Sequence, residues 1–293
     1  MTPNRLGWGG VAVAIVAFFI ALPPIAVRSP VPSLVLALVA IGMGVISLRG
    51  GDEQRPGWTA IVFAVLCGGL AYGATQADLD KLEVVAAWGA LAAATLRFAT
   101  PLIFAGLGGL VSERAGVVNI GLEGMLLMGA FFAAWGADKT GSWLLGILIG
   151  VVAGMALAAI HAVWSISMRA DQIVSGTAIN LIALGVTGYL YVDIYGAEGT
   201  PDDLPQVPEL SLPTESLGFL GRAIANQNLL VWAGLVSVVV VWLVVFRSAF
   251  GLRLRSVGEN PRAAETVGVG VYKMRYIAVI ASGALAAAGG AFL

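Results

Sequence analysis

The stretch from Trp143 to Ser167 reads WLLGILIGVVAGMALAAIHAVWSIS and holds no aspartate, glutamate, lysine or arginine. As a helix it would be about 37 Å long, which exceeds the roughly 30 Å hydrocarbon core of a bilayer. Further apolar runs of similar length lie on both sides of it. The sequence therefore predicts an all-α fold, a polytopic transmembrane helical bundle of about nine spans. The expected spans are 8–27, 31–48, 58–75, 84–110, 119–136, 143–167, 173–195, 228–246 and 274–293.

The composition of the whole chain agrees with a membrane protein. Of its 293 residues 59% are hydrophobic and 11% are charged, whereas soluble domains carry roughly 25% charged residues. A net charge of -1 leaves no basic surface for nucleic acid. The single cysteine, Cys67, allows neither an intramolecular disulfide nor a paired-cysteine metal site. These features exclude a soluble enzyme, and we expect no nucleic-acid partner, metal or cofactor.

Basic residues indicate how the spans are oriented, because short loops rich in lysine and arginine stay in the cytoplasm. With Arg5 inside, alternation of the nine spans places 11 of the 16 basic residues on the cytoplasmic side. The longest outer loop, 196–227, is acidic and contains four prolines. We expect it to form an irregular cap with little regular structure. It could contact an external partner or serve only as a solvated connection.

The segment 112–125, SERAGVVNIGLEGM, contains a carboxylate where an apolar helix is expected. Asn119 is predicted to cap that helix, and Glu123 lies about one turn inside it. A carboxylate is costly in the membrane and should face a bundle interior, a cavity or a partner. Glu123 could therefore act in the translocation path or its gate, or hold neighbouring helices by a structural hydrogen bond. Glycines at 121, 124 and 129 would permit either close packing or a backbone break.

A second polar cluster enters the span at 173–195. Thr177 and Asn180, three residues apart, share a flank, and Ser175 is turned partly away. Such side chains could contact a transported ligand, or could only bond a neighbouring helix.

Two other polar residues occur within spans. Arg97 should be paired or reach toward the interface, and Glu123 is one possible partner. The only histidine, His161, lies in an apolar stretch and is expected to be structural.

The cytoplasmic stretch 250–269 is predicted to contain a short helix outside the bilayer. Asn260 can cap it, Pro261 suits its first position, and Gly268 can end it. A helix of about two turns between two spans could dock into a groove on another protein.

Taken together, the sequences ERAGVVNIGLEG at 113–124 and GENPRAA at 258–264 resemble those of ATP-binding-cassette (ABC) importer permeases. The resemblance is to the branched-chain amino acid, simple sugar and nucleoside superfamily, and is greatest for nucleoside and simple-sugar permeases. It covers roughly residues 86–293. It implies a cytoplasmic ABC ATPase, a second homologous permease subunit and an extracytoplasmic substrate-binding lipoprotein as partners, besides the lipid bilayer.

The resemblance also implies residue roles. The segment 259–268 resembles the coupling helix that contacts the ATPase, and 119–124 resembles a core segment near the translocation path. The substrate-path candidates are Asn119, Glu123, Thr177 and Asn180. The ATPase-coupling candidates are Gly258, Glu259, Asn260, Pro261, Ala263, Ala264 and Gly268.

Two parts of the chain depart from the family pattern. Residues 1–80 precede the permease core, 81–293, and would form an accessory segment of three spans. Family members continue beyond the point where this sequence ends, at Leu293, so we expect the core to be incomplete at its C-terminus.

The sequence thus predicts a multi-pass permease of the cytoplasmic membrane that moves a nucleoside or simple sugar and has no ATPase site of its own. The alternative is an ion-coupled secondary transporter of a small polar solute. That class normally needs several acids within the membrane, and only Glu123 lies well inside a span. A membrane-embedded enzyme is disfavoured because no nucleophile, base and metal-ligand constellation is present.

Overall fold

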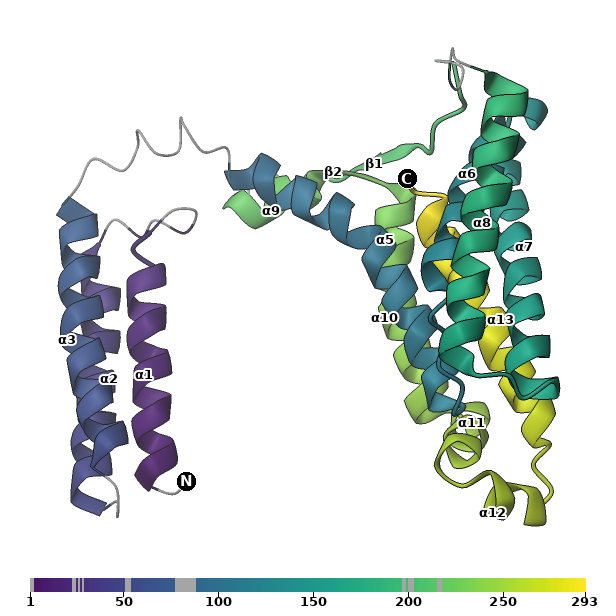
Figure 1. Cartoon of the computed structure of the whole chain (residues 1–293). Helices are drawn as coiled ribbons and strands as arrows, with labels where there is room; N and C mark the ends of the chain where they lie inside the picture. Colours follow the sequence, from purple (N-terminus) through teal and green to yellow (C-terminus); the bar gives the residue numbers. More distant parts are fainter. Residues whose placement is uncertain are drawn as a thin grey trace. The chain divides into compact units, whose positions relative to one another are not determined.

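The computed structural model describes residues 3–22, 25, 27, 29–50, 54–76, 88–196, 199, 203–214 and 218–293. The chain divides into two compact units, 1–94 with 212–225 and 95–211 with 226–293. Helices dominate both units (Figure 1). Each of the nine predicted stretches contains a helix, and seven helices in the described part of the chain are long and apolar enough to cross a membrane. The predicted all-α membrane fold is confirmed.

In the first unit, the helices α1 (Pro3–Phe19), α2 (Pro30–Gly50) and α3 (Arg55–Gln76) are held together by small side chains. Ala14, Ala40 and Ala64, one from each helix, are buried together. A Cβ atom at Gly10 would lie only 3.0 Å from that of Ala60, so the backbones approach closely. Helix α1 begins and ends earlier than predicted, because Pro3 suits a helix start and a turn follows at 20–22.

The second unit is built around three helices that meet through glycine. These are α6 (Leu122–Thr140), α7 (Trp143–Ala162) and α13 (Val271–Gly290). The Gly129 backbone lies against the Ala287 backbone, and a Cβ atom at Gly150 would lie 2.6 Å from the Gly129 carbonyl oxygen. The sequence did not decide whether Gly129 serves close packing or a backbone break, and this contact shows that it serves close packing.

The remaining membrane helices surround this core. Both α7 of the core and α10 of the surrounding helices end in a turn of π-helix, a feature often found at functional positions. Asp171 and Asn228 accept backbone N–H groups and cap the helices that follow them. These elements are α5 (Trp88–Arg114), η1 (Val163–Ser167), α8 (Gln172–Tyr195), α10 (Leu229–Trp242) and η3 (Leu243–Arg247).

The outer loop is more regular than predicted. Strand β1 (Glu209–Ser211) pairs antiparallel with β2 (Asn226–Asn228), and α9 (Gly218–Ala225) lies between them in sequence. The expectation of an irregular cap was wrong for these residues. Prolines excluded a long ladder, but a three-residue ladder needs few backbone donors.

The stretch predicted to be cytoplasmic forms two helices, α11 (Ala249–Glu259) and α12 (Pro261–Thr266). The second has the predicted cap: Asn260 Oδ1 accepts from the Ala263 N–H at 3.1 Å, and Pro261 occupies the first turn. Gly268 follows at φ +84°. The first was not predicted. Ser248 caps it by accepting the Gly251 N–H at 3.0 Å.

Candidate functional site

The chain between α5 and α6 is not helical: turns at 115–116 and 120–121 flank residues 117–119, which have neither helix nor turn. Residues 115, 117, 119 and 121 are buried, whereas 116, 118 and 120 are partly or fully exposed. This alternation is that of a β-strand, but no strand pairs with it within the described residues. We call residues 115–121 the extended segment. Its backbone groups therefore need partners other than a sheet.

Side chains from neighbouring helices supply those partners. Gln172 Oε1, at the start of α8, accepts from the Val118 N–H at 2.8 Å. Asn180 Nδ2 donates to the Ile120 carbonyl at 3.1 Å. On the opposite side, Arg275 Nε of α13 donates to the Ala115 carbonyl at 3.3 Å. The extended segment is held by α8 and α13 together.

The extended segment reaches the middle of the membrane-spanning bundle. Asn119 Nδ2 donates to Ser282 Oγ at 3.0 Å, and Ser282 is the twelfth of the 20 residues of α13. At about 1.5 Å per residue, the contact lies near the midpoint of that span. Non-helical backbone is tolerated at such depth only where protein covers it or where it lines a water-filled cavity. The sequence left open whether the glycines at 121, 124 and 129 mark a break in the helix. In the structure the break lies immediately before Leu122.

Asn119 does not cap α6 as predicted. The helix begins at Leu122, with Gly121 as its N-cap. Asn119 Oδ1 instead accepts from the Gly121 N–H at 3.1 Å, while its amide donates to Ser282. The side chain is 5% exposed, so Asn119 fixes the path of the extended segment.

Glu123 lies in the first turn of α6 and is exposed. Within the part of the chain that the structure describes, no hydrogen bond or ion pair holds its carboxylate. Because α6 begins near the middle of the bundle, this carboxylate lies at a depth where hydrocarbon would be costly for it. The surroundings of Glu123 in the assembled protein must therefore supply water or a polar partner. Among the described residues, no hydrogen bond joins Glu123 to a neighbouring helix.

Thr177 and Asn180 differ in what they contact. Asn180 Oδ1 accepts from the Gly124 N–H at 2.8 Å, so both ends of its amide hold the junction of the extended segment and α6. Thr177 is exposed, and its hydroxyl donates to the Ile173 carbonyl of its own helix at 2.9 Å. Asn180 thus organises the site, and Thr177 faces outward beside it.

His161 is fully buried between α7 and α8. Its Nδ1 lies 2.9 Å from Ser175 Oγ. This contact joins α7 to α8. It agrees with the structural role predicted for His161.

Arg97 does not pair with Glu123. Its Nε donates to Gln227 Oε1 at 3.1 Å, and its Nη2 donates to the Asn226 carbonyl at 2.9 Å. The same Nη2 lies 3.6 Å from a Glu209 carboxylate oxygen. Arg97 therefore binds both strands of the hairpin at the other end of α5, because α5 carries it away from the extended segment.

One coupling candidate, Gly258, contacts the extended segment directly. A Cβ atom at Gly258, near the end of α11, would overlap the Arg114 carbonyl oxygen and lie 3.2 Å from the Gly116 nitrogen. Gly116 has φ +77°, a conformation that favours glycine. The two sequence motifs that carry the family resemblance thus meet backbone to backbone.

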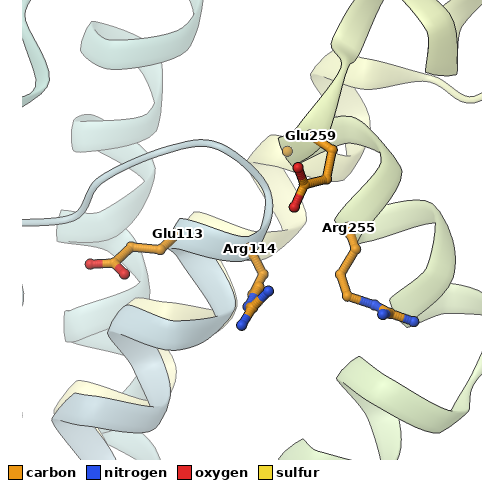
Figure 2. Close-up of a pocket in the computed structure, with 5 residues that line it drawn as sticks. Glu113, Arg114, Arg255 and Glu259 are labelled. Atoms are coloured by element: carbon orange, nitrogen blue, oxygen red, sulfur yellow. The ribbon is translucent and has the colours of Figure 1, made fainter.

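A pocket of about 350 Å³ opens beside this contact (Figure 2). Arg114 and Arg255 place their guanidinium carbons 5.3 and 5.6 Å from the centre of the Phe246 ring, so one aromatic ring contacts both cations. In Figure 2 the Glu113 side chain points away from the other three labelled residues. The lining residues are Glu113, Arg114, Arg255, Gly258 and Glu259.

The coupling candidates within and around α12 are not equally accessible. Ala263 and Glu259 are exposed, as are Asn260 and Gly268. Ala264 is 2% exposed and packs into a cluster with Leu254 and Met274. Ala264 therefore anchors α12 to its own chain, and Ala263 lies on the outer surface.

Three residues that hold the extended segment were not predicted to do so: Gln172, Arg275 and Ser282. Ser282 could have been found as an isolated hydroxyl in the middle of an apolar run. Gln172 and Arg275 lie at the starts of helices, where polar residues are common, so nothing in their local sequence distinguishes them.

Comparison with known proteins finds similarity to transporter permeases over the second unit of the chain. The family described as branched-chain amino acid transport system / permease component matches residues 91–293. The guanosine ABC transporter permease protein NupQ of Bacillus subtilis is 41% identical over 223 residues, covering 71% of this chain and 68% of the relative. The nucleoside ABC transporter permease protein NupC of Lactococcus lactis is 40% identical over 205 residues, 67% of this chain and 64% of the relative.

A sugar transporter subunit is equally similar. The putative glucose ABC transporter permease protein TsgC13 of Haloferax volcanii is 40% identical over 205 residues, 68% of this chain and 61% of the relative. The chain spans about two thirds of the length of these relatives. No solved structure matches the chain.

Proposed function

We propose that this chain, which belongs to the branched-chain amino acid transport system permease family, moves a nucleoside through the cytoplasmic membrane as the permease subunit of an ABC importer. Simple sugars are the second substrate class. The chain is a multi-pass membrane protein, and its relatives are transporter subunits rather than enzymes. ATP hydrolysis would take place on a separate cytoplasmic ATPase. A second homologous permease and an extracytoplasmic binding lipoprotein would complete the importer.

The observation that carries the proposal is the contact between Gly258 and the extended segment. Movement of α12 by an ATPase would pass through α11 to Gly258, and from there to Gly116. Asn119 and the start of α6 lie within six residues of Gly116 in the chain. Force applied at the cytoplasmic surface thus has a short packed route to the middle of the bundle.

The extended segment supports a translocation path at that depth. Transporters commonly place substrate near the bilayer midplane, where helices are discontinuous. Glu123 and Thr177 are exposed on the elements that meet there, α6 and α8. We assign these two to the path, with Asn119 and Asn180 as residues that position it. Hydroxyl-rich substrates such as nucleosides would find acceptors in the carboxylate and hydroxyl groups.

We also assign two parts to the chain. The permease core is assigned to residues 81–293 and an accessory membrane segment to 1–80. The family match begins at residue 91, so α1, α2 and α3 lie outside it.

Uptake into right-side-out membrane vesicles that are loaded with ATP tests the function. Vesicles carrying this chain with its partner subunits should accumulate radiolabelled guanosine or uridine in proportion to ATP supply, and unlabelled nucleoside should compete better than glucose. Collapse of the ion gradients with ionophores should leave uptake unchanged while ATP is present. Uptake that follows an ion gradient without any ATPase subunit would favour the secondary transporter instead.

A further inference from the structure

A second pocket, of about 290 Å³, lies where the end of α7 meets the start of α13. The start of α13 lies at the same end of the bundle as α12 (Figure 1). The lining of this pocket shares no residue with that of the pocket in Figure 2. Its lining contains two arginines, two hydroxyl groups and no carboxylate, unlike that of the other pocket. The lining residues are Ser165, Ile166, Arg169, Val271, Tyr272 and Arg275.

Neither arginine has an acidic partner. Within the described residues no carboxylate oxygen lies within 4.0 Å of Arg169 or Arg275. Asp171, the nearest acid to Arg169 in sequence, uses its Oδ1 to accept the N–H groups of Ile173 and Val174 at 2.9 and 3.1 Å. Two cations therefore line one pocket without local neutralisation.

Each guanidinium is positioned by one hydrogen bond and keeps further donors. Arg169 Nη2 donates to the Tyr272 hydroxyl at 3.4 Å, and Arg275 Nε donates to the Ala115 carbonyl at 3.3 Å. A guanidinium has five N–H donors. The remaining donors suit a ligand with several acceptor oxygens and negative charge, of which phosphate is the common biological example.

The backbone at Arg169 is held in an unfavourable conformation. Its φ is 54°, the one positive φ at a non-glycine residue within the described part of the chain. Such a conformation persists when surrounding contacts fix it, and it often marks a functional position. The π-helical turn η1, which contributes Ser165 and Ile166 to the pocket, precedes it directly. Glycine at position 169 would adopt this conformation without strain, but the guanidinium group would be lost.

Exposed apolar side chains lie close to Arg169 in sequence. Met168 is 68% exposed, and Ile173 and Val174 are 59% and 69% exposed. By the distribution of basic residues, this end of the bundle meets the cytoplasmic leaflet. Basic pockets at that level can bind the head groups of anionic lipids, whose acyl chains would lie on such apolar side chains.

We propose that the pocket between Arg169 and Arg275 binds a phosphate group at the cytoplasmic surface of the membrane. The phosphate belongs either to an anionic phospholipid or to a soluble phosphate ester. Bound phosphate would contact Arg275, which also holds the Ala115 carbonyl. Occupancy should therefore stabilise the extended segment.

Binding to the purified full chain in uncharged detergent tests this site. The probes are phosphatidylglycerol, diacylglycerol, which lacks the phosphate, and soluble glycerol 3-phosphate. Native mass spectrometry would count bound lipid, and the unfolding midpoint Tm would be followed with each probe. Phosphatidylglycerol should bind at least about tenfold more tightly than diacylglycerol and raise Tm, as expected for charge-assisted hydrogen bonds. An equal rise with glycerol 3-phosphate would assign the phosphate to a soluble ester, and a rise with the lipid alone would assign it to the membrane.

Variants separate binding from folding. Arg169→Gly relieves the strained backbone, so Tm without ligand should not fall, yet the effect of phosphatidylglycerol should weaken about tenfold or more. Arg169→Lys keeps the charge and should retain most of the binding. Arg253→Gln removes an exposed arginine outside the pocket and should bind like the unchanged chain. Equal phosphatidylglycerol binding by the chain and by Arg169→Gly, or no response to either phosphate probe, would overturn the proposal.

Discussion

Asn180 shows how a single side chain organises non-helical backbone inside a membrane protein. Its amide accepts the Gly124 N–H and donates to the Ile120 carbonyl. Gly124 is buried, so its N–H would lack a partner without this amide. An unsatisfied buried polar group costs about 1–3 kcal/mol. The side chain thus contributes mainly by preventing this cost.

Replacement of Asn180 by alanine should therefore lower the free energy of unfolding by about 2 kcal/mol, measured by denaturant titration in detergent. Thr177→Val is the matched control on the same helix, since the Thr177 hydroxyl binds only its own backbone. That variant should stay within about 0.5 kcal/mol of the unchanged chain. Equal stability of the two variants would show that the amide does not hold the segment.

Glu123 has no partner among the described residues, so its charge should matter to transport rather than to folding. In Glu123→Gln, uptake should fall at least about tenfold, because one charged hydrogen bond is worth about that much. Tm and the amount of ATPase that copurifies should be unchanged. A fall in Tm that accounts for the lost uptake would return Glu123 to a structural role.

At the scale of elements, the sequence predicted helices well wherever one apolar run formed one span. The short helix α12 was predicted in detail because its cap is local: Asn260 and Pro261 decide it within four residues. The extended segment was not predicted, because its partners Gln172 and Ser282 come from helices more than 50 residues away. Local apolarity favours a helix from residue 119, whereas the hydrogen bonds of Asn119 and Asn180 keep 119–121 out of the helix.

The same limit applies to the candidate site. The sequence pointed to Glu123 and Asn180 because polar groups are costly in a membrane. It did not show that Asn180 binds the backbone whereas Glu123 has no partner among the described residues. It also grouped Ala264 with Ala263 on one docking surface, although Ala264 is buried against its own chain. Side chains on so short a helix can face either way, and the packing of α11 and α13 decides the matter.

The contact between Gly258 and the Arg114 backbone makes a specific prediction about coupling. In Gly258→Ala the added methyl group would overlap the Arg114 carbonyl oxygen, so α11 must shift from the extended segment, at a cost of about 1–3 kcal/mol. Uptake should be lost while the ATPase still copurifies, since the exposed surface of α12 is unchanged. ATP hydrolysis should no longer respond to substrate.

Gly185→Ala is the matched control for that variant. Nothing lies within 4 Å of the place where its Cβ atom would be, and alanine is the better helix former by about 0.5–1 kcal/mol. Its uptake should match that of the unchanged chain. Normal uptake by Gly258→Ala as well would show that force does not pass through this contact.

At the scale of the whole molecule, the orientation assigned from basic residues puts α12 and the hairpin on opposite sides of the membrane. Arg253 and Arg255 lie in α11 and Arg262 in α12, whereas Glu209 lies in β1. The functional assignment depends on this arrangement, because an ATPase can reach α12 only from the cytoplasm. Arg97, which binds the hairpin, would then mark the outer end of α5.

Cysteine labelling in intact cells measures this arrangement directly. In a Cys67→Ala background, the Ser211→Cys variant should react with a membrane-impermeant maleimide, because Ser211 is exposed in β1. The Thr266→Cys variant, exposed at the end of α12, should react only after the membrane is permeabilised. Both cysteines should label equally in detergent, which controls for local accessibility. Labelling of Thr266→Cys in sealed cells would place α12 outside, where no ATPase could act on it, and both the orientation and the coupling assignment would fail together.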